Sequence, residues 1–409
     1  MKNKRIIIIG AGAAGIFAAV NAAKNNTEIQ VTVLEKSSKL LSKVKVSGGG
    51  RCNVTNACVE TKELIKNYPR GNKELNEPFS KFKTTDTIDW FLKRGVKLKT
   101  EPDGRMFPIT NSSQTIIDCL LNECNNYNVK INTNTEVKSI IKQAGIFQLL
   151  IGNDQTLECE KLLIATGGGN KPESYKWLEA LGHTIENPVP SLFTFNLKNN
   201  PITQLAGVSV ADATVKIAGT KFTQKGPVLI THWGLSGPAI LKLSAWGARV
   251  LNEKNYVYTV LINWISESNE QKAREILEEY KSANPLKKVS GTSPFLLPKR
   301  LWEHLVSKAE IGSETRWNNL SGKNYNRLIN NLVSDEYSAS GKTTFKEEFV
   351  TCGGIKLNEI NLHTMESKIC PGLFFAGEVL NIDGVTGGFN FQAAWTSAWL
   401  AAKEMSANS

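Results

Sequence analysis

A glycine-rich hexapeptide directly after a β-branched run constrains the fold of this chain more than any other feature. The run Ile6 to Ile9 leads into Gly10-Ala11-Gly12-Ala13-Ala14-Gly15, and the alanine-rich stretch Ile16 to Ala23 predicts a helix. In such a unit Gly10 permits a tight turn, Gly12 removes a side chain that would block a pyrophosphate, and Gly15 lets the helix pack closely on the strand. The helix N-terminus offers N–H groups and a positive dipole end to phosphates. The sequence therefore predicts a dinucleotide-binding turn.

An acidic residue follows at the spacing that this turn requires. A second predicted strand, Gln30 to Leu34, ends at Glu35, which lies 20 residues after Gly15. A carboxylate there accepts hydrogen bonds from a ribose diol. Glu35 favours an unphosphorylated ribose, as in FAD or NAD, although the neighbouring Lys36 weakens its repulsion of a 2′-phosphate.

A run of three glycines favours FAD over NAD. It lies in the segment from Lys43 to Asn56, KVKVSGGGRCNVTN. Three successive glycines lose much backbone entropy on folding, and close approach of the main chain to a ligand is the usual compensation. A flexible surface linker is the alternative. The residues of this segment expected at the cofactor are Lys43, Ser47, Gly48, Gly49, Gly50, Arg51, Cys52 and Asn53.

Two further segments support FAD. Lys161 to Gly169 is an apolar strand that runs into small residues, and Gly372 to Gln392 combines a strand, acidic residues, a double glycine and a helix. The second segment would supply an acceptor for a ribityl hydroxyl and a helix dipole aimed at an anionic ring. An NAD dehydrogenase does not need it. The residues of these segments expected at the cofactor include Gly168, Gly377, Glu378, Phe389 and Gln392.

A set of distinctive motifs is spread along the chain: GAGAAG, SGGGRCNVTN, DGRMFP, THWGLSGPA, TCGG and GEVLNIDGVTGGFNFQAAWTSA. With these motifs, nearly the whole chain resembles the YhiN-type flavoproteins. This is the BaiN/RdsA family of FAD-dependent oxidoreductases, which are aminoacetone-oxidase-like. The resemblance implies an α/β, Rossmann-like FAD fold of the two-dinucleotide-binding type. It also implies that Val137, Thr166 and Gly167 lie near the adenine or pyrophosphate, and that Asp383, Gly387, Gly388 and Asn390 lie near the flavin half. Phe389 stands where the family pattern has tyrosine, so a stacking role survives there and a hydroxyl role does not.

The FAD fold is expected to be split along the chain. Residues 1–190 and 346–409 form its two parts, and residues 191–345 form an inserted, substrate-facing domain. Alternating runs such as 213–217 and 256–260 predict strands over about 191–265, while 271–280 and 301–308 predict helices within about 266–345. The resemblance likewise implies a β-barrel-like portion and a small helical portion.

Most of the chain's positive charge falls in the insert. The whole chain carries +11, and residues 191–345 hold 19 Lys and Arg against 12 Asp and Glu, or +7. This asymmetry favours a polyanionic substrate, and a well-solvated helical surface explains it equally well. Within the insert, His232 and the predicted helix start at Pro238 are candidates for a substrate contact, His232 as ligand or proton carrier. The alternatives are a buried structural histidine and an ordinary strand-to-helix turn.

Three residues near the glycine run are candidates for catalysis. Cys52 is the sharpest candidate for a proton donor, because Arg51 could lower its pKa, and a small cysteine packed on the cofactor is the alternative. Arg105, followed by Phe107, could orient a substrate or hold the charge of reduced flavin. A second glycine motif of comparable quality is missing, so we expect NAD(P)H to bind transiently over the flavin.

The cysteine pattern bears on location. Seven cysteines without a CxxC pair indicate neither a disulfide framework nor a zinc site, so we expect a cytoplasmic protein without a metal. The apolar stretch Ile6 to Val20 spans 15 residues, too few to cross a bilayer, so we expect no stable membrane association. The oligomeric state is left open.

These features favour an NAD(P)H-dependent FAD reductase that saturates an activated C=C bond. The resemblance offers two substrates, uridine in ribosomal RNA, which gives dihydrouridine, and a conjugated steroid of the bile-acid type. The basic insert favours RNA. The resemblance also allows an amine or aminoketone oxidase, and an RNA-binding protein with structural FAD is the non-enzyme alternative.

Overall fold

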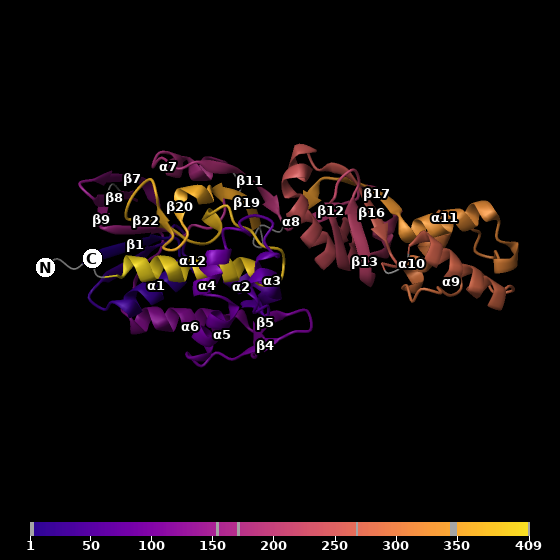
Figure 1. The fold of residues 1–409 in the computed structure, drawn as a ribbon, viewed down its shortest axis with the longest axis horizontal. Coiled ribbons are helices and arrows are strands. Elements are labelled where there is room, and N and C mark those ends of the chain that lie inside the picture. Colours follow the sequence, from indigo (N-terminus) through magenta and orange to yellow (C-terminus); the bar gives the residue numbers. More distant parts are fainter. Residues whose placement is uncertain (1–3, 153–154, 170–171, 267–268, 344–349, 408–409) are drawn as a thin grey trace. The chain divides into compact units, whose positions relative to one another are not determined.

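The computed structural model describes residues 4–152, 155–169, 172–266, 269–343 and 350–407. The chain forms two compact units, which we call the first unit (Met1–Ser191 with Phe345–Ser409) and the second unit (Leu192–Thr344). The chain leaves the first unit, builds the second and returns, so that the C-terminal segment completes the first unit (Figure 1). The architecture is α/β with an inserted domain.

A seven-stranded sheet forms the centre of the first unit, in the order β20-β21-β22-β10-β1-β2-β6. The strands from β22 to β6 are parallel, and β20 and β21 add an antiparallel edge. Ile6 to Ile9 are all buried, as a central parallel strand requires. The two N-terminal strands are those predicted from the sequence. The strand bounds are β1 (Arg5–Ile9), β2 (Gln30–Leu34), β6 (Lys130–Asn132), β10 (Lys161–Ile164), β20 (Ile360–Asn361), β21 (Glu366–Ser367) and β22 (Leu373–Phe375).

Two long helices from opposite ends of the chain pack against each other in this unit. They are α1 (Ala13–Asn25) and α12 (Phe389–Met405), which lie side by side in Figure 1. Phe17 of α1 lies 5.1 Å, between ring centroids, from Trp395 of α12. Both helices are buried over most of their length, and their many alanines allow this close packing. The returning segment is therefore part of the core.

Smaller elements surround the central sheet. A three-stranded sheet has the order β3-β5-β4, another has the order β7-β8-β9, and β11 pairs with β19. No helix among the described residues is long and apolar enough to cross a membrane. The bounds are β3 (Thr55–Asn56), β4 (Leu98–Thr100), β5 (Arg105–Pro108), β7 (Val137–Gln143), β8 (Ile146–Ile151), β9 (Gln155–Cys159), β11 (Ile185–Ser191), β19 (Val350–Ile355), α2 (Ser42–Gly50), α3 (Thr61–Ile65), α4 (Asn76–Lys81), α5 (Thr84–Leu92), α6 (Ser113–Asn126) and α7 (Lys176–Glu179).

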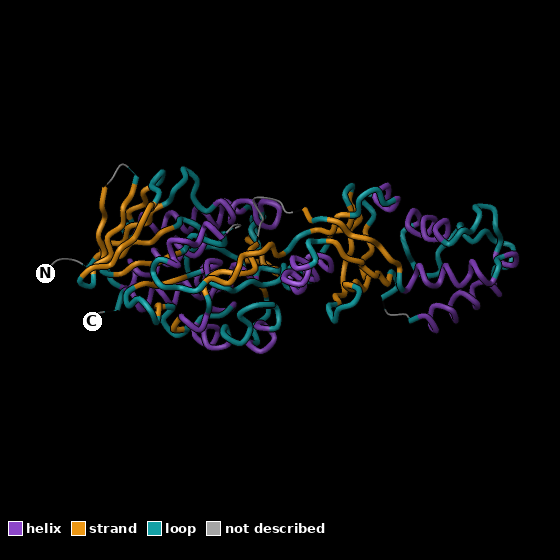
Figure 2. Tube along the Cα trace, turned by 90° about the horizontal axis from the view of Figure 1, so that it is seen from above, coloured by secondary structure: helices purple, strands orange, loops and turns teal. Residues whose placement is uncertain are grey.

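The second unit combines a seven-stranded sheet with a helical part. The sheet has the order β17-β16-β13-β14-β15-β12-β18, with α8 packed on β13 and β14. Figure 2 shows its strands grouped together and helices gathered at one end of the unit. These helices are α9, α10 and α11. The bounds are β12 (Thr194–Asn196), β13 (Ser209–Ile217), β14 (Thr223–Thr231), β15 (Gly234–Ser236), β16 (Val257–Asn263), β17 (Asp335–Ser340), β18 (Lys342–Thr343), α8 (Pro238–Glu253), α9 (Glu270–Ala283), α10 (Lys299–Lys308) and α11 (Gly322–Val333).

The helical part of this unit ends earlier than the sequence pattern indicated. Helices were expected through about residue 345, but the chain returns to strand in β17 and β18. Asp335, Tyr337 and Ala339 are buried in alternation, because β17 adds an edge to the sheet beside β16. The predicted strands 213–217 and 256–260 fall within or beside β13 and β16, and the predicted helices fall within α9 and α10.

A buried amide fixes α12 to the rest of the first unit. The side-chain oxygen of Gln392 accepts hydrogen bonds from Thr55 Oγ1 (2.6 Å) and Thr87 Oγ1 (2.9 Å). Its amide nitrogen donates to Thr396 Oγ1 (3.1 Å). All four residues are buried, so these groups depend on one another for their hydrogen bonds. Gln392 thus joins the returning helix to two earlier segments.

Replacing this amide should destabilise the protein. In Gln392→Leu the hydroxyls of Thr55 and Thr87 lose their common acceptor, and leaving a buried donor unpaired costs about 1–3 kcal/mol. We therefore expect the free energy of unfolding in urea to fall by about 2–4 kcal/mol. Gln114, exposed on α6, is the matched control, and Gln114→Leu should change stability by less than about 0.5 kcal/mol. Equal stability of the two variants would contradict the assigned role.

Candidate functional site

The first turn of the fold reserves open space at one glycine. A Cβ on Gly10, whose φ is 106°, would lie 2.4 Å from the Ala165 carbonyl oxygen, and one on Gly15 would lie 1.9 Å from the Gly10 carbonyl oxygen. A Cβ on Gly12 would meet no described atom within 4 Å. Gly15 is thus required by close packing, as predicted, and Gly10 by packing as well as by its positive φ, while Gly12 faces space that a ligand can enter. Gly12 is also the N-cap of α1, and no described side chain caps it.

Glu35 lies at the carboxyl end of β2 with its carboxylate held in place. Oε2 accepts a hydrogen bond from Ala11 N–H (3.0 Å), and Oε1 accepts from both the N–H and the hydroxyl of Ser37 (2.9 Å each). A carboxylate has about four acceptor positions, so capacity remains for a ribose hydroxyl. The side chain is half-buried, while the neighbouring Lys36 is exposed.

The triple-glycine segment presents bare main chain. Gly48, Gly49 and Gly50 have φ values of 58°, 69° and 84°, a left-handed backbone that glycine tolerates best. A Cβ on Gly49 or Gly50 would meet no described atom within 4 Å, whereas one on Gly48 would lie 2.8 Å from the Phe107 ring. The segment is a helix, α2, that kinks at residues 47–49, rather than a loop throughout.

Cys52 does not have the environment that the sequence suggested. Its side chain is fully buried, and burial raises the pKa of the thiol to about 12, although a hydrogen bond with Ser47 opposes that rise. The Arg51 guanidinium binds Glu101 (Nη1 to Oε1, 2.6 Å) and lies 4.0 Å above the Phe107 ring. The prediction that Arg51 lowers the pKa of Cys52 is therefore wrong, because desolvation dominates and the arginine is paired elsewhere.

Glu101 joins the two candidate arginines and was missed by the sequence analysis. Its Oε2 accepts from Arg105 Nη2 (3.0 Å), while Arg105 Nε donates to Asp103 (2.7 Å). The Arg105 guanidinium also lies 5.5 Å from the Phe107 ring. Both arginines thus stand beside one aromatic ring beneath the glycine segment. The four-residue spacing of Glu101 and Arg105 was a weak signal for this pairing.

A second cluster brings together three residues predicted at the cofactor. Glu378 Oε2 accepts from Lys43 Nζ (2.6 Å), and Oε1 accepts from the Thr351 N–H (2.7 Å). A Cβ on Gly168 would lie 2.4 Å from Thr351 Oγ1 and 3.0 Å from Glu378 Cδ. The neighbouring Gly167, with φ of 75°, faces open space within the described chain. Residues 43, 168 and 378 therefore converge, with Lys43 and Glu378 paired to each other.

Asp383 is a buried residue whose carboxylate binds other side chains of the protein. It is fully buried, and its carboxylate accepts hydrogen bonds from the Arg70 guanidinium and from Ser191 Oγ (2.8 Å). Burial raises the pKa of Asp383, and the adjacent Arg70 opposes that rise. The prediction of a direct cofactor contact is wrong for Asp383, because protein atoms cover it completely. No local sequence signal indicated Arg70 as its partner.

The other polar residues of the closing segment are also used internally. Asn390 accepts from the Gly384 N–H (2.8 Å) and donates to the Gly384 carbonyl (2.9 Å), which closes the loop before α12. Gln392 is fully buried with the threonine partners described above, so its predicted direct cofactor contact is also wrong.

The main-chain N–H groups at the start of α12 are not capped by a described side chain. Gly388 is the N-cap, with φ of 91° and no capping side chain among the described residues. A Cβ there would lie 2.3 Å from the Thr55 carbonyl oxygen, so the backbone needs glycine. Gly387 has φ of 139°, and a Cβ on it would lie 2.6 Å from the Phe389 ring. Phe389 is itself buried, edge-on to Tyr68 at 6.0 Å.

The remaining candidates are more dispersed. Gly377 is buried with φ of 76°, and Val137 is half-buried at the start of β7. His232 is exposed between β14 and β15 of the second unit, so the alternative of a buried structural histidine is wrong. Pro238 occupies the first turn of α8, as predicted, after the N-cap Gly237. Within the described ranges no group of His, Cys, Asp and Glu could hold a metal ion.

The geometry fits a dinucleotide with a pyrophosphate. Gly12, Gly49 and Gly167 face open space, and the first turns of α1 and α12 are free of capping side chains in the described chain. Asn53, whose N–H lies near Gly48, has a buried Oδ1 without a hydrogen-bond partner among the described residues. A buried acceptor of this kind is expected to gain its partner from a bound group. The fold and site define a dinucleotide-binding Rossmann protein.

Comparison with known proteins places the chain in a family. Residues 4–404 match the family model described as HI0933-like protein Rossmann domain, and the chain belongs to that family. It is 34% identical over 410 residues to the ribosomal RNA dihydrouridine synthase of Escherichia coli (strain K12), covering 98% of this chain and 97% of the relative. It is 26% identical over 407 residues to the 3-dehydro-bile acid delta(4,6)-reductase of Clostridium scindens, covering 98% of each.

A solved structure shows the same fold. The 3-ketosteroid-delta4-(5alpha)-dehydrogenase from Rhodococcus jostii RHA1 matches with a TM-score of 0.51 and 12% identity, covering 98% of this chain and 97% of that one. The solved structure bears on the fold alone, and the family membership with the two relatives identifies the chain as an FAD-dependent oxidoreductase.

The open space at Gly12 gives a direct test of the cofactor site. Gly12 has φ of −82°, so a valine there strains neither the backbone nor the packing, yet its side chain occupies the expected pyrophosphate position. We expect Gly12→Val to fold normally and to lose most of its bound flavin, measured by visible absorbance per protein. Gly322→Val, at a glycine of the second unit that is equally open, is the control and should keep its flavin. Equal flavin content in the two variants would contradict the site.

The environment of Cys52 predicts an unreactive thiol. With a pKa of about 12, only about one thiol in ten thousand is ionised at pH 8, and the thiolate is the reactive form. We expect iodoacetamide to leave Cys52 unmodified in the native protein and to alkylate it in urea, as mass spectrometry of peptides would show. Rapid native alkylation at pH 8 would mean that the thiol is accessible and ionised.

Proposed function

We propose that the first unit binds FAD and that the protein uses NAD(P)H to reduce an activated C=C bond, with uridine in ribosomal RNA as the substrate. The observation that carries this proposal is the 34% identity to a ribosomal RNA dihydrouridine synthase over 98% of the chain. The open glycine segments support the cofactor. A ribosomal RNA substrate implies a cytoplasmic location, and a stable membrane association is not needed.

Different residues of the first unit bind different parts of the cofactor. The N–H groups at the start of α1 hold the pyrophosphate, and Glu35 accepts a hydrogen bond from the adenosine ribose. The glycine main chain at 48–50 and the start of α12 lie against the flavin half, where the helix dipole favours negative charge on the ring. Bound flavin supplies two-electron transfer at N5.

The reduction requires a proton as well as a hydride equivalent. Saturating the C5–C6 bond of uridine adds a hydride to one carbon and a proton to the other. Cys52 carries its proton at neutral pH, and Arg51 and Arg105 are charged donors that Glu101 holds beside Phe107. In this proposal the arginines orient the uracil carbonyls and the proton comes from solvent, because the Cys52 thiol is fully buried. NAD(P)H binds transiently, since the sequence contains a single dinucleotide turn of this quality.

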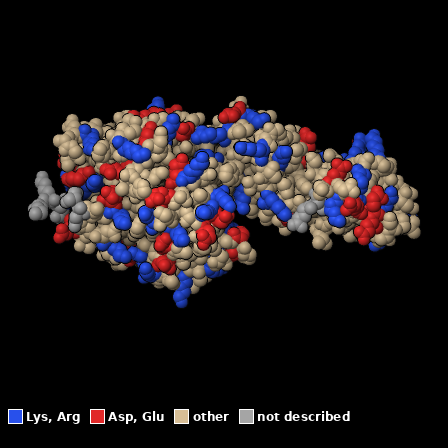
Figure 3. Space-filling view, viewed as in Figure 1, with Lys and Arg blue, Asp and Glu red and all other residues tan. Residues whose placement is uncertain are grey.

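The net charge of +7 in residues 191–345 supports RNA as the substrate. Figure 3 shows Lys and Arg side chains interspersed with Asp and Glu on the visible face of the second unit. A dispersed pattern of this kind suits general attraction of a polyanion more than recognition of a single phosphate. The second candidate is a conjugated steroid of the bile-acid type, which the similarity to the Clostridium scindens reductase favours.

Two measurements test the function in sequence. Anaerobic NADPH or NADH should bleach the flavin, and subsequent addition of unmodified ribosomal RNA should restore its absorbance. A strain that lacks the gene should lose a dihydrouridine from its ribosomal RNA, and the wild-type gene should restore it while the Gly12→Val variant does not. An unchanged modification map would overturn the RNA substrate, and reoxidation by a conjugated ketosteroid would then favour the second candidate.

A further inference from the structure

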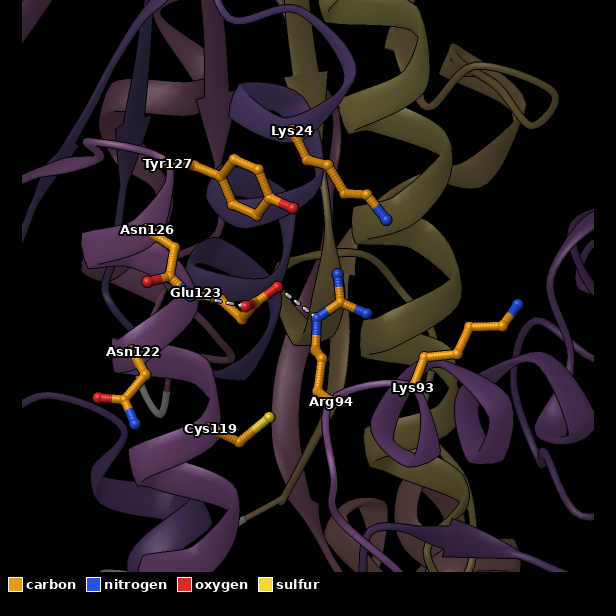
Figure 4. A pocket seen from close by; sticks show the side chains of 8 residues that line it. All are labelled: Lys24, Lys93, Arg94, Cys119, Asn122, Glu123, Asn126 and Tyr127. Carbon is orange, nitrogen blue, oxygen red and sulfur yellow. Dashed lines mark hydrogen bonds and ion pairs between the residues drawn. The ribbon is translucent and has the colours of Figure 1, made fainter.

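A cavity of about 430 Å³ on the first unit lies at the C-terminal end of α1, the opposite end from the Gly12 turn of the dinucleotide site. Its wall comes from the C-terminal ends of three helices, α1, α5 and α6. Three cations line it, Lys24, Lys93 and Arg94, together with the single carboxylate of Glu123. Figure 4 shows Lys24, Arg94 and the hydroxyl of Tyr127 pointing toward the same space.

Arg94 is the fixed element of this cavity. Its side chain is only 9% exposed, and Nε donates to Glu123 Oε2 at 2.5 Å. Nη1 donates to the Trp90 carbonyl (3.0 Å), and the guanidinium lies 3.6 Å above the Trp90 ring. Nη2 makes no hydrogen bond within the described chain. The guanidinium is thus nine-tenths buried and is fixed by Glu123, by the Trp90 carbonyl and by the Trp90 ring. Its Nη2 group is left as a donor for a ligand.

The two lysines have no partner of their own. Neither Lys24 nor Lys93 forms a side-chain hydrogen bond, ion pair or ring contact with any described residue, and both are exposed. Surface lysines are usually solvated, but these two come from different helices and border the same cavity as Arg94. The carboxylate of Glu123 is already used by Arg94 and by Asn126 Nδ2 (3.1 Å). The cavity therefore has a net charge of +2 and uncommitted donors.

The helix ends reduce this charge only in part. A helix C-terminus carries about half a negative charge, concentrated on carbonyls without intrahelical partners. In α5 the Phe91 carbonyl accepts from the N–H groups of Arg94 and Val96, and the Leu92 carbonyl accepts from Gly95. In α6 the Cys124 carbonyl accepts from Val129. Because these carbonyls are already hydrogen-bonded, the ammonium groups remain available for an anion.

We infer that this cavity binds a phosphate group. An ammonium group, a fixed guanidinium and a tyrosine hydroxyl that point toward one space, with the second lysine at the border, match a compact oxyanion with several acceptor oxygens. The phosphate belongs either to the backbone of an RNA strand or to a small phosphorylated molecule, and the chemistry of the site is the same for both. The inference does not rest on the proposed reaction, since binding alone is at issue.

The test uses FAD-loaded protein, so that the dinucleotide turn is already filled. Inorganic phosphate and a single-stranded oligouridylate are titrated separately into the wild type and into Lys24→Gln/Lys93→Gln. The matched control is Lys62→Gln/Lys138→Gln, which removes two exposed lysines of the same unit that have no partner among the described side chains. Circular dichroism and flavin content should be the same in all three proteins.

We expect the cavity variant to bind inorganic phosphate at least ten-fold more weakly, and the control to stay within two-fold of the wild type. If RNA occupies the site, RNA affinity falls as well, and its logarithmic salt dependence loses about 0.7 per phosphate contact removed. If only phosphate binding falls, a small phosphorylated molecule is the ligand. Absence of phosphate binding by the wild type, or equal losses in both double variants, would overturn the inference.

Discussion

The close approach of three backbone segments at the carboxyl end of β1 is the constraint on which the first unit depends. Gly10 passes within reach of the Ala165 carbonyl, and Gly15 brings α1 against Gly10 itself. Because a Cβ at either position would overlap a carbonyl oxygen, α1 must begin where β1 and β10 end. The orientation of the α1 N-terminus, and so the direction of its free N–H groups, follows from this contact rather than from any side chain.

The C-terminal segment positions a second helix start by the same kind of close backbone contact, this time against β3. Gly388 brings the start of α12 against the Thr55 carbonyl, and Gln392 one turn later hydrogen-bonds Thr55 and Thr87. The second uncapped helix start is thereby fixed relative to the first by contacts between residues more than 300 positions apart in sequence. Such long-range pairing makes the cofactor site a property of the whole unit, which forms only after the chain has passed through the insert.

The sequence predicted what local signals determine. The strand, turn and helix of the first 25 residues, and the second strand ending at Glu35, each follow from periodicity and glycine spacing over a few residues. The partners of Asp383 and Gln392 could not be predicted in this way. Both residues lie in a glycine-containing segment that suggested ligand contact, and only the fold shows that Arg70, Ser191 and two threonines already use their polar atoms.

Adjacency in sequence was misleading for Arg51 and Cys52 for a related reason. A φ of 61° at Cys52 turns the chain there, and the thiol enters the core while the guanidinium reaches Glu101 and Phe107. The position of a charge in the sequence is misleading in the same way. The count of charged residues along the chain emphasised residues 191–345, but the effect of a charged side chain on a ligand depends on its ion-pair partners and on its burial. Arg94 is one of 49 basic residues, and what distinguishes it is that Trp90 and Glu123 fix it while Nη2 remains uncommitted among the described residues. Composition therefore indicates that anions are attracted, whereas only the packing around a cation indicates where one is bound.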